Sequence, residues 1–150
     1  MSVRTRMATV EDVESLFEIR TSVTQNHLSR EQMDALGITP QVLRSAINEG
    51  PCVWIAEVDE RPVAFSMIDR DEGEVFAMFV RPAFENRGLG RLLMAAAEAE
   101  LFQAHERIFL VTDGRQEIRA NGFYQRLGYQ PVGEPYDEVG IAHIGMARLL

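Results

Sequence analysis

Three β-rich runs that follow one another closely constrain the fold of this chain more than any other feature. The runs CVWIAEVD (52–59), RPVAFSMID (61–69) and EVFAMFV (74–80) are separated by short, turn-prone stretches rich in Asp, Glu, Arg and Gly. Apolar, β-branched and aromatic residues broken by such turns are the pattern of an antiparallel meander. The sequence therefore predicts three consecutive antiparallel strands near the middle of the chain.

The N-terminal flank carries a strand followed by a capped helix. VRTRM (3–7) alternates like a short strand, and Thr9 with Asp12 three residues later is typical of an N-cap that opens a helix. Apolar residues recur along this helix with helical spacing, at Val13, Leu16, Phe17 and Ile19. A strand and an amphipathic helix are therefore expected here.

Two further segments precede the meander. The less regular segment 21–37 predicts a short second helix or a loop. In ITPQVLRSAINEGP, Thr39 can cap a helix, Pro40 fits its first turn, and Gly50 followed by Pro51 ends it. A helix is therefore expected from about residue 39 to residue 49.

The C-terminal half alternates between helices and strands. A helix is predicted from Leu89 to about His105, and its apolar face comprises Leu89, Leu92, Leu93, Ala96, Ala97 and Leu101. RIFLVT (107–112) reads as a buried strand, and a helix from about Gln116 to Leu127 is closed by Gly128. Two last strands are expected in 129–134 and 140–150. The element order is then β-α-α-β-β-β-α-β-α-β-β.

Composition excludes several functions. The chain has 150 residues, 46% of them hydrophobic, which suits a single globular domain spanning residues 1–150. No window approaches a membrane span and no secretory signal is recognisable, so a cytoplasmic location is expected. The net charge is −8 and basic residues are scattered, which argues against nucleic acid or a membrane as partner and favours a cationic small substrate.

Side-chain chemistry narrows the choice further. All basic residues other than histidine are arginines, so a lysine Schiff base or a P-loop lysine is ruled out. Cys52 is the single cysteine, and its apolar setting indicates a buried structural residue more than a nucleophile.

The stretch RGLG (87–90) between the third meander strand and the following helix indicates an anion site. Helix N-termini carry unpaired N–H groups and the positive end of the helix dipole. Gly88 and Gly90 lack β-carbons that would obstruct a pyrophosphate, and Arg87 and Arg91 can add charge-assisted hydrogen bonds. An ordinary tight loop is the alternative. The spacing fits neither the dinucleotide fingerprint nor a Walker motif.

Two segments together resemble the GNAT superfamily of N-acetyltransferases. The first is VFAMFVRPAFENRGLGRLLMAAAEAEL (75–101), where Glu85 stands at a position usually held by Gln or Arg. The second is EIRANGFYQRLGYQPVG (117–133), where Glu117 replaces a usual Asn while Ala120, Phe123, Tyr124, Gly128 and Tyr129 match. The order of elements agrees as well, so the resemblance covers nearly the whole chain.

This resemblance implies a fold, a cofactor and a set of site residues. The fold is a mixed α/β structure, with a mostly antiparallel sheet of about seven strands and about four flanking helices. Its parallel strands 75–80 and 107–112 splay apart to admit the pantetheine arm of acetyl-CoA; no metal is expected. The implied coenzyme contacts are Met78, Phe79, Val80, Glu85, Asn86, Arg87, Gly88, Leu89, Gly90, Arg91, Ala120 and Tyr124.

The resemblance also assigns catalytic roles. The backbone N–H of Met78 would stabilise the oxyanion and Tyr124 would act as general acid. Glu74 is a candidate for activating the amine through water, or else a solvated charge at a strand end. His27 and His143 are further candidates for the base, although a lone histidine is more often structural.

The expected function is direct transfer of an acetyl group to a primary amine of a small molecule or peptide. A non-catalytic acyl-CoA-binding or regulatory module is the alternative, and a longer acyl group or an oxygen nucleophile is also left open. Residues 22–37 and 136–141 lie outside the motifs and are expected to shape acceptor specificity. Trp54, Phe76 and Phe79 lie on apolar strands and are expected in the core, with the lining of an acceptor pocket as the alternative for some of them. Because relatives are often dimers, the resemblance leaves a homodimer open.

Overall fold

A seven-stranded sheet forms the centre of the molecule. The computed structural model describes residues 2–24, 27–113, 119–138 and 141–149. The strands are β1 (Val3–Met7), β2 (Val53–Val58), β3 (Arg61–Asp69), β4 (Glu74–Val80), β5 (Arg107–Asp113), β6 (Gln130–Glu138) and β7 (Ile141–Leu149). Their order is β1-β2-β3-β4-β5-β7-β6, with β4 and β5 parallel and the other neighbours antiparallel. The predicted meander and the parallel pair are confirmed.

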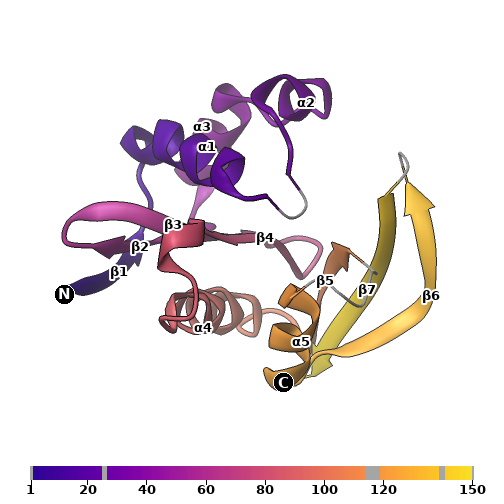
Figure 1. Cartoon of the computed structure of the whole chain (residues 1–150). Coiled ribbons are helices and arrows are strands. Elements are labelled where there is room, and N and C mark those ends of the chain that lie inside the picture. Colours follow the sequence, from indigo (N-terminus) through magenta and orange to yellow (C-terminus); the bar gives the residue numbers. More distant parts are fainter. Residues whose placement is uncertain (1, 25–26, 114–118, 139–140, 150) are drawn as a thin grey trace.

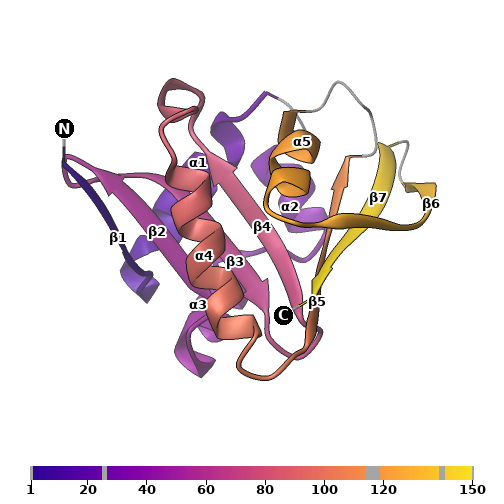
Figure 2. The same ribbon diagram turned by 90° about the horizontal axis from the view of Figure 1, so that it is seen from below.

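Helices cover the two faces of this sheet. They are α1 (Val13–Ser22), α2 (Arg30–Ala35), α3 (Pro40–Glu49), α4 (Leu89–Leu101) and α5 (Arg119–Arg126), with 3-10 turns at η1 (Val10–Asp12) and η2 (Pro82–Phe84). Figures 1 and 2 show α1, α2 and α3 on one face and α4 and α5 on the other. The predicted mixed α/β architecture is confirmed. The short helix α2 lies in the segment that the sequence left open between helix and loop, so α-helices outnumber the predicted four.

The predicted helix caps are present. The N–H of Thr9 donates to Asp12 Oδ2 over 2.7 Å, which begins η1 and then α1. Thr39 Oγ1 accepts a hydrogen bond from the N–H of Val42 over 3.2 Å at the start of α3. Such local side-chain bonds satisfy helix N–H groups that have no partner inside the helix, so short polar residues there fix where a helix begins.

Helix α4 differs from its prediction in length and in the face that it buries. It ends at Leu101 and not near His105. Leu92, expected in the core, is 46% exposed, whereas Met94 and Glu98 are buried. Residues 89, 93, 97 and 101 form a continuous row at a spacing of four, and at 100° per residue Met94 lies nearer to that row than Leu92 does. The buried stripe is therefore rotated away from Leu92.

A glycine ends helix α5 as predicted. Gly128 has φ +100°, the N–H of Tyr129 donates to the carbonyl of Tyr124, and the N–H of Gly128 donates to the carbonyl of Gln125. This pair of bonds is a Schellman motif, which requires a left-handed residue at that place. The predicted helix start near residue 116 lies outside the described residues, and the described part begins at Arg119.

A buried polar cluster ties α4 to the C-terminal strands. Glu98 of α4 is 8% exposed and accepts hydrogen bonds from the Tyr129 hydroxyl and from Arg148 Nη1, both over 2.7 Å. Tyr129 precedes β6 and Arg148 lies in β7, so the one carboxylate connects three elements. Burial, with the Glu98 carboxylate adding to it, raises the pKa of Tyr129 far above its ordinary value. The hydroxyl therefore stays a hydrogen-bond donor at physiological pH.

Within the described ranges, no helix combines the length and the apolar character that spanning a bilayer requires.

Candidate active site

The parallel strands β4 and β5 diverge along their length. Their register pairs Glu74 with Phe109, and the N–H of Phe109 donates to the carbonyl of Gly73 over 3.0 Å. Beyond this point β4 continues to pair with β3, while β5 pairs with β7. Figure 2 shows the two strands meeting at one end and separating toward the end that leads into α4. We call this separation the splay.

The register fixes which backbone groups face the splay. The N–H of Arg81 donates to the carbonyl of Val63 in β3 over 2.9 Å, so the peptide groups of Arg81 and Phe79 point toward β3. In an antiparallel pair the intervening residues direct their N–H and C=O groups to the opposite side. Met78 and Val80 therefore present both backbone groups toward β5, on the side where that strand has moved away.

The N-terminus of α4 lies directly after β4. Gly88 is its N-cap with φ +81°, and no side chain caps it. The N–H of Leu92 donates to the carbonyl of Gly88 over 3.3 Å, so the helical ladder begins there. The preceding N–H groups, those of Leu89, Gly90 and Arg91, occupy the first turn, where an α-helix offers no internal acceptor. With the helix dipole behind them, they form a site suited to an anion.

The residues of this loop differ in what they can offer a ligand. Arg91 is exposed, as are the loop residues Glu85, Asn86, Arg87 and Gly88. The Leu89 side chain is 1% exposed, so that residue can contribute its backbone N–H but not its side chain. Arg87 lies 5.2 Å from the centre of the Phe84 ring, which holds it along the loop.

The two glycines of RGLG are required for different structural reasons. A β-carbon on Gly88 would meet nothing within 4 Å, which leaves open space beside its left-handed backbone. A β-carbon on Gly90 would lie 3.2 Å from Phe123 Cζ and 3.4 Å from Met78 Cε. From the sequence we expected both glycines to serve the approach of a ligand. Gly90 instead allows α4 to pack closely on α5 and β4, which brings Met78, Phe123 and the first turn of α4 together.

Tyr124 adjoins this group through its neighbour Phe123. Its ring packs edge-on against Phe123, with 5.4 Å between ring centres, and against Tyr129, with 6.0 Å. Burial raises the pKa of Tyr124 to about 12, because the phenolate would lose its hydration. The hydroxyl therefore remains protonated at neutral pH and can donate a hydrogen bond or a proton.

Glu74 is placed differently from the other predicted catalytic residues. It is half-buried where β4 meets β5, and burial, followed by the charges of Asp69 and Glu72, raises its pKa. Met78 is four residues further along the strand, a separation of roughly 13 Å at about 3.3 Å per residue. The fold therefore does not bring Glu74 next to the Met78 N–H, and a proton path between them needs more than one water.

The remaining predicted residues are less informative. His27 is exposed, and its Nδ1 lies 2.9 Å from the carbonyl oxygen of Val23. Glu117 lies outside the described residues, as do the side chains of Ala120 and His143. In the described part of the chain, no three His, Cys, Asp or Glu side chains are grouped as a metal site needs.

One of the three aromatic residues predicted in the core lies at the surface instead. Phe76 is 49% exposed, because the register of β3 and β4 shifts there and places an extra residue in β4. Such a β-bulge turns a side chain out of the regular alternation. Phe79 is partly buried and packs on Phe65, with 5.8 Å between ring centres. Trp54 is 9% exposed and belongs to the core as predicted.

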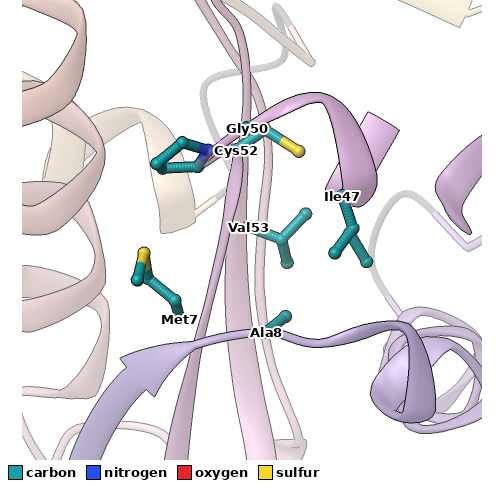
Figure 3. Close-up of a pocket in the computed structure, with 7 residues that line it drawn as sticks. Met7, Ala8, Ile47, Gly50, Cys52 and Val53 are labelled. Carbon is teal, nitrogen blue, oxygen red and sulfur yellow. The ribbon is translucent and has the colours of Figure 1, made fainter. Parts of the chain in front are cut away.

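A separate pocket lies toward the β1 edge of the sheet. Figure 3 shows it between the end of β1, the start of β2 and the end of α3; its volume is about 250 Å³ and its lining comprises Met7, Ala8, Ile47, Gly50, Pro51, Cys52 and Val53. Cys52 is 7% exposed, and burial raises the pKa of its thiol. A neutral, buried thiol is a poor nucleophile, so Cys52 has the properties of a structural residue.

Comparison with solved structures finds the same fold in several acetyltransferases. PaiA N-acetyltransferase from Thermoplasma acidophilum in complex with coenzyme A is 18% identical, with a TM-score of 0.78 and complete coverage of both chains. Ard1 from Thermoplasma volcanium is 18% identical, with a TM-score of 0.78 and coverage of 100% of this chain and 99% of that one. The ribosomal-protein-S18-alanine N-acetyltransferase from Escherichia coli is 18% identical, with a TM-score of 0.73 and coverage of 99% and 94%.

Sequence comparison gives the family. Curated protein sequences yield no match to this chain. The family model for the acetyltransferase (GNAT) domain matches residues 23–150, which includes the splayed strands, the RGLG loop and α5. The match therefore covers every element from which the candidate site is built. The chain belongs to the GNAT family of acetyltransferases and is an acyltransferase enzyme.

Proposed function

We propose that this protein transfers an acetyl group from acetyl-CoA to a primary amine, directly and within a ternary complex. One observation carries the proposal: the first turn of α4, which no side chain caps, follows directly from the strand that leaves its backbone groups facing the splay. A diphosphate carrier linked to an extended amide chain matches both features. The coenzyme A bound to the related PaiA structure supports this choice.

The coenzyme would be held by backbone groups. Its pyrophosphate would accept hydrogen bonds from the N–H groups of Leu89, Gly90 and Arg91, with the Arg87 and Arg91 guanidinium groups adding charge. Its pantetheine amides would pair with Met78 and Val80 as an added strand would. This path would bring the thioester beside Met78, which lies with Phe123 around Gly90.

The chemistry then follows from the groups nearby. The amine nitrogen attacks the thioester carbonyl carbon, and the Met78 N–H stabilises the oxyanion that forms. The intermediate collapses, the carbon–sulfur bond breaks and an amide remains. Tyr124 donates a proton to the departing sulfur, and the proton that the nitrogen loses after its attack replaces the proton that Tyr124 gives up. Because a pKa of about 12 lies above that of a thiol, this replacement must accompany the transfer.

The acceptor would reach the thioester from the face of the sheet opposite α4. Figure 1 shows α1 and α2 over this face, while α4 and α5 lie on the other. The family fold is used by an enzyme that acetylates a ribosomal protein, which supports a peptide or protein amine as one class of acceptor. A small amine is the other class.

Replacing Glu74 with Gln tests the proposed proton path. If Glu74 accepts, through waters, the proton that the incoming ammonium must lose before its nitrogen can attack, kcat/KM falls as the pH drops through the pKa of Glu74, which is raised above 4.5. Glu74→Gln is then expected to remove this acidic limb and to lower kcat/KM by about 10²-fold at neutral pH. Thiol release measured from pH 5 to pH 9 provides the profile. An unchanged profile would assign Glu74 to the surface charge of the strand end.

Replacing Gly88 with Val tests coenzyme binding. A branched side chain is expected to fill the open space beside the first turn of α4 and to raise the Kd for acetyl-CoA at least about 100-fold. Gly37→Val is the matched control, because Gly37 has φ +82° and equally open surroundings but lies between α2 and α3. Both variants carry the same backbone strain. Equal coenzyme affinities in the two variants would contradict the proposal.

A further inference from the structure

Two arginines have a buried nitrogen without a hydrogen-bond partner. Both lie on the face of the sheet opposite α4, from which the acceptor would approach. Among the described residues, the buried side-chain polar atoms in this state are Nη1 of Arg20 and Nε of Arg81. Buried donors in folded proteins are nearly always paired, so such atoms call for an explanation. Here both belong to guanidinium groups at one end of β4.

Their positions place them beside the proposed reaction centre. Arg20 lies in the last turn of α1, with its guanidinium carbon 4.1 Å from the centre of the Phe79 ring. Phe79 adjoins Met78 in β4, and its side chain lies on the opposite face of the sheet from that of Met78. Arg81 follows two residues later on the same face as Phe79, and its Nη2 is 3.5 Å from Glu18 of α1. Both cations therefore lie where an acceptor would approach.

A second arginine stacked on a phenylalanine ring shows that stacking alone does not explain why Arg20 lacks a carboxylate partner. Arg30 lies 4.2 Å from the centre of the Phe17 ring, nearly the same stacking distance, and it also forms an ion pair with Glu14. Arg20 forms no ion pair with any described residue, although the chain has 23 acidic residues against 15 arginines. Acidic side chains are thus plentiful, and none is supplied at this position by the described part of the chain.

The position in α1 is otherwise apolar. Val13, Leu16 and Phe17 are buried on the face of α1 to which Arg20, four residues after Leu16, also belongs. Burial lowers the pKa of Arg20 to about 10, which still leaves it charged at neutral pH. An apolar residue at position 20 would complete this face, and it would avoid the loss of hydration that a buried cation suffers. A cation retained there is suited to a ligand that supplies the missing negative charge.

We propose that Arg20, with Arg81 beside it, binds a carboxylate of the acceptor, so that the amine acetylated by this enzyme belongs to an amino acid or to a peptide with an acidic first residue. The planar guanidinium matches a carboxylate with two parallel hydrogen bonds. The net charge of −8 attracts the ammonium end of such an acceptor while Arg20 orients its carboxylate end. The inference rests on the proposed acetyl transfer and specifies its substrate class.

Matched acceptors test it in the presence of acetyl-CoA. Thiol release is measured with free amino acids and their α-amides, and with tripeptides that begin with Asp or Glu and with Asn or Gln. We expect kcat/KM to favour the carboxylate member about ten-fold or more in one of the two sets, which identifies the source of the carboxylate. In Arg20→Met we expect this preference to disappear because the KM for the carboxylate acceptor rises, while the calorimetric Kd for coenzyme A is unchanged. Arg30→Met, the matched control, keeps the preference.

A binding measurement decides the question without turnover. The guanidinium NMR signal of Arg20, assigned by its loss in Arg20→Met, is followed in the protein saturated with coenzyme A during titration with N-acetylglutamate or with N-acetylglutamine amide. We expect a saturable shift with the acid at a Kd at least about ten-fold lower than with the amide. Arg20→Lys, which keeps the charge but not the fork, should weaken acid binding.

The outcomes separate the two proposals. Acetylation of amines with no preference for the carboxylate, or equal shifts with acid and amide, would overturn the carboxylate subsite alone. Failure to bind any coenzyme A species would overturn the proposed function.

Discussion

Replacing Tyr124 with Phe is expected to lower kcat by about 10²–10⁴-fold, the usual contribution of a positioned general acid. The substitution removes one oxygen and keeps the ring, so the edge-on packing with Phe123 and Tyr129 is preserved. The calorimetric Kd for acetyl-CoA should therefore change little. Because burial raises the pKa of Tyr124 to about 12, its titration should not reduce the wild-type rate below about pH 10. Steady-state thiol release gives kcat.

Tyr129→Phe provides the control for this experiment. It also removes a buried tyrosine hydroxyl from the same aromatic cluster, but that hydroxyl donates to Glu98 and not toward the splay. It should lower stability while leaving kcat near the wild-type value. Wild-type turnover in Tyr124→Phe would remove Tyr124 from the mechanism, and an equal loss in both variants would show that the cluster acts through packing.

Replacing Glu98 with Ala is expected to lower the free energy of unfolding by about 2 kcal/mol or more. Glu98 is 8% exposed and is the common acceptor for Tyr129 and Arg148. Its loss leaves the fully buried Tyr129 hydroxyl without an acceptor and leaves Arg148 without its carboxylate. Urea unfolding at pH 7 measures the change, with the slope m used to check that the transition remains two-state.

Glu14→Ala is the matched control for stability. Glu14 is also a helical glutamate paired with an arginine, but its side chain is 64% exposed. Exposed ion pairs contribute about 0–1 kcal/mol, so this variant should unfold near the wild-type urea concentration. Similar losses in the two variants would mean that the contacts of Glu98 with Tyr129 and Arg148 contribute no more to stability than an exposed ion pair does.

Helix boundaries that depend on residues close together in the sequence were predictable. Thr9 with Asp12, Thr39 with Pro40, and Gly128 each act within a few residues, so their helix boundaries could be read directly. The buried face of α4 was harder to predict, because leucine and methionine are equally apolar. Whether Leu92 or Met94 is buried depends on how α4 packs on β2, β3 and β4.

The candidate site divides in the same way. The RGLG loop and the strand before it are contiguous, so their juxtaposition follows from the chain itself. The packing reason for Gly90 depends on Phe123, which is more than thirty residues away, and no local pattern contains that contact. Arg20 was detectable in principle as a charge within the apolar stripe of α1. Its stacking on Phe79 and its missing partner required the tertiary structure.

Calorimetric titration of the wild-type protein with coenzyme A and with pantetheine tests the central claim most directly. Pantetheine keeps the amides and the thiol but lacks the pyrophosphate and the adenosine 3′-phosphate, and dephospho-coenzyme A, which lacks only the 3′-phosphate, is titrated alongside to separate the two. If the first turn of α4 holds that diphosphate, coenzyme A should bind at least about 100-fold more tightly than pantetheine, and the difference should shrink at high salt. Equal affinity for the two compounds, or no uptake of coenzyme A at all, would contradict the account.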